Sequence, residues 1–205
     1  MIGEEEHRKA IQKIAEKFKG HDLDLLLLGS SSVLYRYGTV RRTKDIDVHP
    51  FPMEPYIDFY EDLEEIAEEL NGSFNIETGG SSITFFADIH GETLTVELID
   101  AGGTHFLTKE VLDDMIDRAD EIDGVHVPSD EHLIVAKAEA YLDRNEEDIN
   151  KDKFFDDLID LREKIEQGEI KLDNDEMKRV IGLRPEKKRS RLESIIDTQF
   201  SDRYS

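Results

Sequence analysis

The chain contains no cysteine and no long hydrophobic run. The lack of cysteine excludes disulfide bonds, thiol nucleophiles, cysteine-ligated zinc fingers and iron–sulfur clusters. No apolar segment approaches the roughly 20 residues that a transmembrane helix needs, so we expect no membrane span. The first ten residues, MIGEEEHRKA, carry acids where a secretion signal needs a basic start and an apolar stretch. We therefore expect a cytoplasmic protein.

Basic residues are also scarce over most of the chain. Its 205 residues hold 26 Lys and Arg against 49 Asp and Glu, a formal net charge of −23. A surface this acidic opposes general attraction to nucleic acid or anionic membranes. Residues 177–191 depart from this pattern, because they hold seven basic side chains and one acidic side chain. This segment either pairs with acidic groups of its own chain or a second subunit, or forms a local phosphate-binding patch.

Hydrophobic periodicity predicts an α/β region followed by an all-helical region. Short apolar or alternating runs predict strands, with the last two joined as a hairpin, at residues 23–28, 45–49, 83–89 and 93–99. Helical spacing predicts helices at residues 4–18, 57–70 and 107–120. Pro50 is expected to end the strand that begins at Asp45. After Pro128 the pattern is helical almost to the end, so we place a boundary there.

Residues 23–49 place an anion-binding turn beside a pair of carboxylates. Gly29 permits close approach of the backbone, and the next helix, capped by one of the three serines that follow, presents N–H groups to an anion. Asp45 and Asp47 are two positions apart on a strand, so both side chains point to the same face. They repel each other unless a cation lies between them, and Mg²⁺ and Mn²⁺ prefer such hard oxygen ligands. This combination is typical of phosphoryl and nucleotidyl transfer.

The stretch from Leu25 to Pro50 resembles the nucleotidyltransferase superfamily related to DNA polymerase β. The pattern of that superfamily, a hydrophobic residue, Gly, Gly or Ser, a spacer and Asp-hydrophobic-Asp, is matched by Leu28, Gly29, Ser30, Asp45, Ile46 and Asp47. The preceding Arg-x-Thr-Lys is similar to small bacterial and archaeal branches, including the abortive-infection-type enzymes. The resemblance implies an α/β (α+β) fold. Residues 1–127 would form a short mixed sheet flanked by helices, and residues 128–205 a helical C-terminal region.

The superfamily uses a third carboxylate from a neighbouring strand. Glu97 lies on the polar face of the predicted strand 93–99, because Leu94, Val96 and Leu98 alternate with it. Asp88 and Asp100 are the alternatives. His49 shares the face of the Asp pair, and we interpret it as a histidine packed at a strand end.

Lys137 lies at helical spacing from Leu133, Ile134 and Tyr141, so it shares their buried face. A lysine there must find a counter-charge or extend its ammonium to solvent. The segment that contains it resembles the Leu-Ile-x-x-Lys-x-x-Ala-x-x-x-Arg helix of small superfamily members, whose lysine faces the nucleotide phosphates. Lys137 is therefore a candidate phosphate ligand. We assign no role to Asp157, because Phe154 replaces an acid of the pattern around it.

The resemblance implies transfer of a nucleoside monophosphate from an NTP, ATP among them, to an acceptor hydroxyl by a two-metal mechanism. Asp45, Asp47 and Glu97 would be the catalytic residues and the ligands of Mg²⁺ or Mn²⁺. The nucleotide-binding residues would be Gly29, Ser30, Lys44 and Lys137.

The acceptor stays open between RNA, a protein and a small molecule, and RNA would contact Lys178 to Arg191. The alternative is a nucleotide-binding or interaction protein of the same fold with little or no activity, for example in a toxin–antitoxin pair. A homodimer or a cognate protein partner fits either hypothesis.

Overall fold

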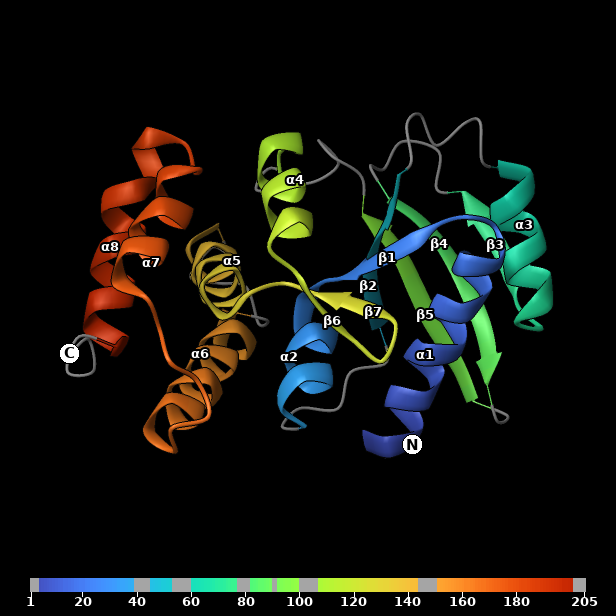
Figure 1. Cartoon of the computed structure of the whole chain (residues 1–205), viewed down its shortest axis with the longest axis horizontal. Coiled ribbons are helices and arrows are strands. Elements are labelled where there is room, and N and C mark those ends of the chain that lie inside the picture. The colour runs from blue at the N-terminus through green and yellow to red at the C-terminus, as the bar shows by residue number, and fades with distance from the viewer. Residues whose placement is uncertain are drawn as a thin grey trace. The chain divides into compact units, whose positions relative to one another are not determined.

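The structure is a computed structural model that describes residues 4–38, 45–52, 60–76, 82–89, 92–99, 107–143 and 151–200 (Figure 1). Its helices are α1 (Glu4–Gly20), α2 (Gly29–Tyr37), α3 (Tyr60–Glu69), α4 (Lys109–Asp117), α5 (Asp130–Asp143), α6 (Lys151–Glu166), α7 (Asn174–Gly182) and α8 (Glu186–Phe200). Its strands are β1 (Asp24–Leu27), β2 (Asp45–Phe51), β3 (Ser73–Ile76), β4 (Ser82–Ile89), β5 (Glu92–Ile99), β6 (Asp120–Ile122) and β7 (Val125–Val127).

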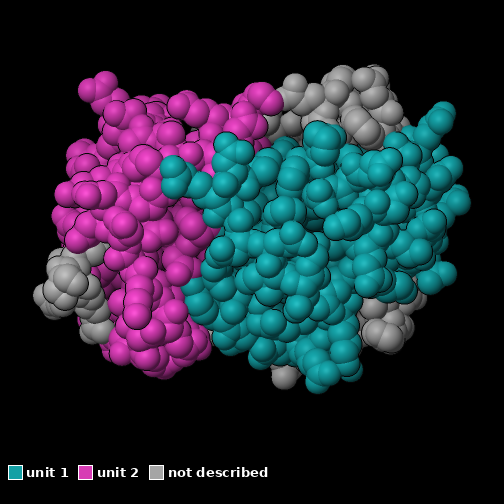
Figure 2. Space-filling model, viewed as in Figure 1, with its two compact units in different colours: residues 1–107, 116–128 teal, residues 108–115, 129–205 magenta. Residues whose placement is uncertain are grey.

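Contacts divide the chain into two compact units, coloured separately in Figure 2. The strand unit comprises residues 1–107 and 116–128, and the helical unit comprises residues 108–115 and 129–205. Most of α4 therefore belongs with the helices of the C-terminal region, although the sequence analysis places it in the first region. None of the helices in the described part of the chain is long and apolar enough to cross a membrane.

The described strands form one mixed sheet, as predicted, in the order β3-β4-β5-β2-β1-β7-β6. The predicted hairpin is β4 and β5, which pair antiparallel from Ser82 opposite Ile99 to Ile89 opposite Glu92. Strand β2 pairs antiparallel with β1 and parallel with β5. The sheet therefore brings β2 and β5 together, although α3, β3 and β4 separate them in the sequence.

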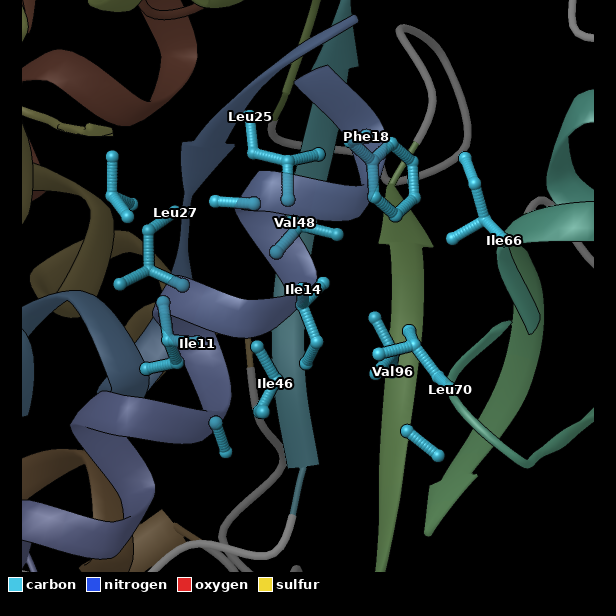
Figure 3. Close-up of a cluster of buried hydrophobic side chains, with 14 of the residues drawn as sticks. Ile11, Ile14, Phe18, Leu25, Leu27, Ile46, Val48, Ile66, Leu70 and Val96 are labelled. Atoms are coloured by element: carbon cyan, nitrogen blue, oxygen red, sulfur yellow. The ribbon is translucent and has the colours of Figure 1, made fainter. Parts of the chain in front are cut away.

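The hydrophobic core of the strand unit lies between one face of the sheet and the helices α1 and α3 (Figure 3). Residues one helical turn apart on α1, including Ile11 and Ile14, pack there with Ile46 and Val48 of β2. Because side chains alternate along a strand, burial of Ile46 and Val48 turns the odd-numbered residues of β2 to the opposite face.

Two of the predicted element ends are wrong. Strand β2 passes through Pro50, which lies opposite Leu25, and ends at Phe51. The pairing of β2 with β5 stops at Val48, so the missing N–H of Pro50 removes no bond on that side. The helix predicted to reach residue 120 ends at Asp117, and Asp120 begins β6. Strand β6 was missed because two of its three residues are acidic and exposed.

The helical unit is built around α5, which contacts α6, α7 and α8. Its buried apolar residues include Ile134 of α5, Leu158 of α6, Val180 of α7 and Leu192 of α8. Buried charged residues also occupy this unit. Glu139 is 1% exposed and Arg184 is 1% exposed, which is rare for such side chains.

Candidate functional site

The three predicted carboxylates lie on two neighbouring parallel strands. The register of β2 and β5 places Asp45 beside Thr95 and Asp47 beside Glu97. Residues paired in this way point to the same face of a sheet, which here is the face opposite buried Ile46. Asp45 is exposed, and Asp47 and Glu97 are half-buried. The structure therefore brings the three carboxylates to one face, with Asp47 and Glu97 directly adjacent.

The two alternatives for the third carboxylate differ in what the structure describes. The backbone of Asp88 pairs with Thr93 on β5, four residues from Glu97 and one strand farther from β2. The side chain of Asp88 and all of Asp100 lie outside the described residues. Only Glu97, among these three, has a described side chain that the register places beside Asp47.

Gly29 is required where α2 begins, for two reasons. Its φ of +61° lies in the left-handed region, which glycine adopts without strain. A Cβ atom at this position would also collide with the carboxylate of Asp47. The N–H of Leu28 donates to the carbonyl oxygen of Asp47 at 2.8 Å. The first residue of α2 and the carboxylate of Asp47 are therefore in close contact.

The prediction that one of the three serines caps α2 is wrong. The N-cap residue is Leu28, and its side chain makes no capping hydrogen bond. The hydroxyl of Ser31 donates instead to the carbonyl oxygen of Asp45 at 3.0 Å, and that of Ser32 donates to Gly29 O at 2.7 Å. Ser30, the predicted phosphate contact, is half-buried in the first turn of α2.

The start of α2 and the carboxylates have opposite electrostatic effects on a phosphate group. A helix N-terminus attracts anions, because its N–H dipoles point outward. The Asp47 carboxylate, which packs against Gly29, repels a phosphate at that position. A divalent cation between the carboxylates and the phosphate would make both interactions favourable.

The carboxylates of Asp45, Asp47 and Glu97 are oxygen ligands of the type that a hard divalent cation prefers, and the register of β2 and β5 sets them on one face. Across the described residues, no three His, Asp or Glu side chains converge closely enough to hold a metal ion. Mutual repulsion of the carboxylates opposes such convergence when no cation is between them. The backbone register brings the three carboxylates to one face of the sheet.

His49 is held by the backbone of β5. Its Nδ1 atom donates to the carbonyl oxygen of Ile99 at 2.7 Å, and the residue is buried. Because a carbonyl only accepts, Nδ1 carries the proton. This contact agrees with the interpretation of His49 as a histidine packed at a strand end.

Lys137 has a buried counter-charge. Its Nζ atom donates to Oδ2 of Asp157 at 2.6 Å, and both side chains are 6% exposed. The ammonium therefore does not extend to solvent. Sequence reasoning missed Asp157 as the partner, although the spacing of the family pattern pointed to it. Lys44, the other predicted phosphate ligand, lies outside the described residues.

Much of the basic segment Lys178–Arg191 is paired within the helical unit. The pairs, with distances of 2.6–3.0 Å, are Arg179–Asp114, Arg184–Glu139, Lys188–Glu139 and Lys188–Asp143. For Arg179, Arg184 and Lys188, the prediction that the segment pairs with acidic groups of its own chain is therefore confirmed. The exposed basic side chains of the segment are Lys178, Lys187, Arg189 and Arg191.

Comparison with known proteins identifies a family that matches most of the chain and a solved structure of similar fold. Residues 7–198 match a family described as nucleotidyl transferase of unknown function (DUF2204). The crystal structure of an antigenic nucleotidyltransferase-like protein from Paracoccidioides brasiliensis has a similar fold, with a TM-score of 0.56 and 14% identity over 78% of this chain and 77% of that chain. No curated protein matches the sequence.

A more distant likeness is to the antibiotic-resistance factor ANT(2'')-Ia. Its solution structure gives a TM-score of 0.47 and 17% identity over 95% of this chain and 93% of that chain. Its crystal structure in complex with adenylyl-2''-tobramycin gives a TM-score of 0.46 and 18% identity over 91% and 97%. Likeness at this level carries no argument about the acceptor.

Proposed function

Since the chain belongs to the nucleotidyl transferase family of unknown function DUF2204, we propose that it moves a nucleoside monophosphate from an NTP to an acceptor hydroxyl with the help of Mg²⁺ or Mn²⁺. The observation that carries the metal requirement is the register that sets Asp47 beside Glu97, together with the packing of the Asp47 carboxylate on Gly29. Adjacent carboxylates beside an anion-binding helix start suit a cation that binds both.

Each residue of this site has a separate task in the proposed reaction. Asp45, Asp47 and Glu97 would hold the divalent cations, which would supply positive charge to the acceptor hydroxyl and the triphosphate. Gly29 lets the phosphates approach the backbone, and Ser30 lies in the first turn of α2 next to it. Orientation of the triphosphate by α2 would set the α-phosphate in line for attack.

The lysines act on the charge of the triphosphate. We propose that Lys137 and Lys44 offset the negative charge that develops on the leaving pyrophosphate. The Nζ atom of Lys137 donates to Oδ2 of Asp157 at 2.6 Å. To bind the triphosphate, Lys137 would have to give up part of this contact for a contact with a phosphate oxygen.

Calorimetric titration with Mn²⁺ tests the metal site. The wild type should bind the ion, and Asp47→Asn should lose most of that affinity because it removes one ligand charge. Asp24→Asn is the matched control, since Asp24 is also a half-buried carboxylate on a strand of the same sheet. Equal binding by wild type and Asp47→Asn would contradict the assignment.

Incubation with each labelled NTP, Mg²⁺ and separate pools of RNA, proteins and small hydroxyl compounds tests the transfer. Label in one pool identifies the class of acceptor. Nucleotide binding without transfer to any pool would support the alternative, a nucleotide-binding or interaction protein of the same fold.

The RNA hypothesis has a sharper test in the exposed part of the basic segment. Replacing Lys178, Lys187 and Arg191 with Gln removes exposed cations and spares the paired Lys188. If RNA is the acceptor, this variant should bind total tRNA more weakly and with a shallower dependence on salt. Unchanged tRNA binding at every salt concentration would exclude this segment as the RNA site.

A further inference from the structure

The carbonyl of Asp45 is held by a buried chain of side chains that begins in α1. The hydroxyl of Ser31 donates to Asp45 O at 3.0 Å, and Nε2 of His7 lies 3.5 Å from the same hydroxyl oxygen. Ser31 is fully buried and His7 is 3% exposed. We propose that His7 and Ser31 are positioning residues, which hold Asp45 in place for metal binding. This inference rests on the proposed function of Asp45 as a metal ligand.

The direction of the two hydrogen bonds follows from the groups themselves. A carbonyl oxygen can only accept, so the single proton of the Ser31 hydroxyl is committed to Asp45 O. The hydroxyl oxygen must then accept from His7, which requires the proton of the imidazole on Nε2. Burial lowers the pKa of His7, so the ring is neutral at pH 7 and the Nε2–H tautomer is the one that this contact selects.

On the β1 side of β2, the strand pairing ends before it reaches Asp45, because β1 is too short. The pairing of β1 with β2 covers Asp24 to Leu27, opposite Phe51 to Val48. One more bond, from Leu28 N–H to Asp47 O at 2.8 Å, follows before the chain turns into α2. Ser31 then satisfies the next carbonyl on this side of β2 with its side chain. The hydroxyl therefore continues a ladder that the backbone cannot continue.

The position of His7 is itself fixed by contacts between α1 and α2. Arg8, the next residue, donates from Nη2 to Leu34 O at 3.4 Å and lies over the ring of Tyr35 at 5.2 Å. Gly38, just after α2, leaves no room for a Cβ atom beside Glu4. The first turns of α1 therefore contact α2 close to His7.

A pair of neighbouring serines offers a matched test. Ser31→Ala removes the bond to Asp45, whereas Ser32→Ala removes an equally buried hydroxyl whose bond to Gly29 O stays within α2. Ser31→Ala should weaken Mn²⁺ binding about tenfold, the scale for loss of a group that orients a metal ligand, and Ser32→Ala should change it less than about twofold. Ser31→Ala should also accelerate amide hydrogen exchange at residues 45–48 more than Ser32→Ala does.

Two variants of His7 test the second link. His7→Gln keeps an N–H donor at a similar reach, and His7→Leu keeps the volume without a donor. We expect His7→Leu to resemble Ser31→Ala, and His7→Gln to stay near the wild type. A purely structural role would make both variants equally harmful to Mn²⁺ binding and exchange. Should Ser31→Ala fail to fold, this pair carries the test.

The outcomes separate the inference from the proposed function. If the wild type binds Mn²⁺ and the Ser31→Ala and Ser32→Ala variants bind it equally well, the positioning role is wrong and the metal site stands. If the wild type binds no Mn²⁺, the metal site is wrong. Hydrogen exchange at residues 45–48 then still decides whether His7 and Ser31 hold the start of β2.

Discussion

The sheet face that carries Asp47 and the interior of the helical unit hold charged residues in opposite arrangements. In the strand unit, like charges are set side by side, since the register places Asp47 next to Glu97 on a partly exposed face. In the helical unit, opposite charges are matched and buried, as Glu139 with Arg184 and Lys137 with Asp157 show. Like charges side by side on a sheet are unfavourable unless a group of opposite charge lies near them, whereas the buried charges of these two helical pairs each have a partner of opposite sign.

The pairs of the helical unit form a connected network around α5. Glu139 accepts from Arg184 and Lys188, which come from the segment between α7 and α8 and from α8 itself. Burial would lower the pKa of Lys188, but its bonds to Asp143 and Glu139 outweigh this effect and raise it. The pKa of Arg184 is lowered, because burial outweighs its attraction to Glu139. The buried positive charge of Arg184 is therefore stabilised by the carboxylate of Glu139.

The largest effect on stability should come from Glu139→Gln. This change leaves Arg184 and Lys188 without their shared carboxylate, and a buried charge without its partner typically costs about 3–5 kcal/mol. Urea unfolding should show a loss of this size. Glu163→Gln, an exposed residue on α6, should change stability by less than about 0.5 kcal/mol. Similar losses for both variants would contradict the contrast between buried pairs and surface charges.

Lys137→Met should cost about 3 kcal/mol, because it leaves the carboxylate of Asp157 buried alone. The double variant Lys137→Met/Asp157→Leu should recover most of this loss, since two apolar residues can replace a buried ion pair. This comparison also separates packing from nucleotide binding. If Lys137 contacts phosphate, the stable double variant still binds ATP about tenfold more weakly, on the scale of one charge-assisted contact.

His132 makes the stability of the helical unit depend on pH. Burial lowers the pKa of His132 to about 4. The carboxylate of Asp114 raises this pKa, and the positive charges of Arg184 and Arg179 offset part of that increase. Nε2 of His132 lies 2.9 Å from Asp114 Oδ2 but makes no hydrogen bond to it, so the effect of burial on the pKa dominates. In the unfolded chain, the imidazole of His132 gains a proton as the pH falls below about 6.5. In the folded chain, it stays neutral until the pH reaches about 4.

Stability should therefore fall as the pH is lowered from 6.5 toward 4, by at most about 1.4 kcal/mol per pH unit from this residue. His132→Asn should flatten this slope in urea unfolding measured across that range. His7 of the strand unit, whose pKa burial also lowers, should leave part of the slope in the variant. A slope identical to that of the wild type would mean that folding does not change the pKa of His132.

The smallest effect on stability should come from Asp47→Asn in the strand unit. The carboxylate is half-buried beside Glu97, so its removal relieves repulsion and should change the free energy of unfolding by less than about 1 kcal/mol. The same variant should lose Mn²⁺ binding. A loss of stability as large as that of Glu139→Gln would mean that Asp47 has a structural role like that of the helical unit's charges.

Local sequence pattern was enough to predict most elements of the fold and the superfamily. The alternation over residues 45–49 placed Asp45 and Asp47 on one face, and helical spacing placed Lys137 on the buried face of α5. The fold class and the superfamily predicted from residues 25–50 are confirmed by the mixed sheet and the family match. The elements and faces could be predicted because periods of 2 and 3.6 residues depend only on neighbours along the chain, whereas the superfamily followed from the resemblance of residues 25–50.

The partners of these residues depended on tertiary structure. Glu97 stands beside Asp47 because β5 joins the sheet next to β2 in parallel register, and Lys137 meets Asp157 because α6 packs on α5. The sequence by itself determined which face each residue occupies. Only the packing of distant elements decided which residue lies opposite, because strand order and helix contacts arise from burying apolar faces together and leave no local periodicity in the chain.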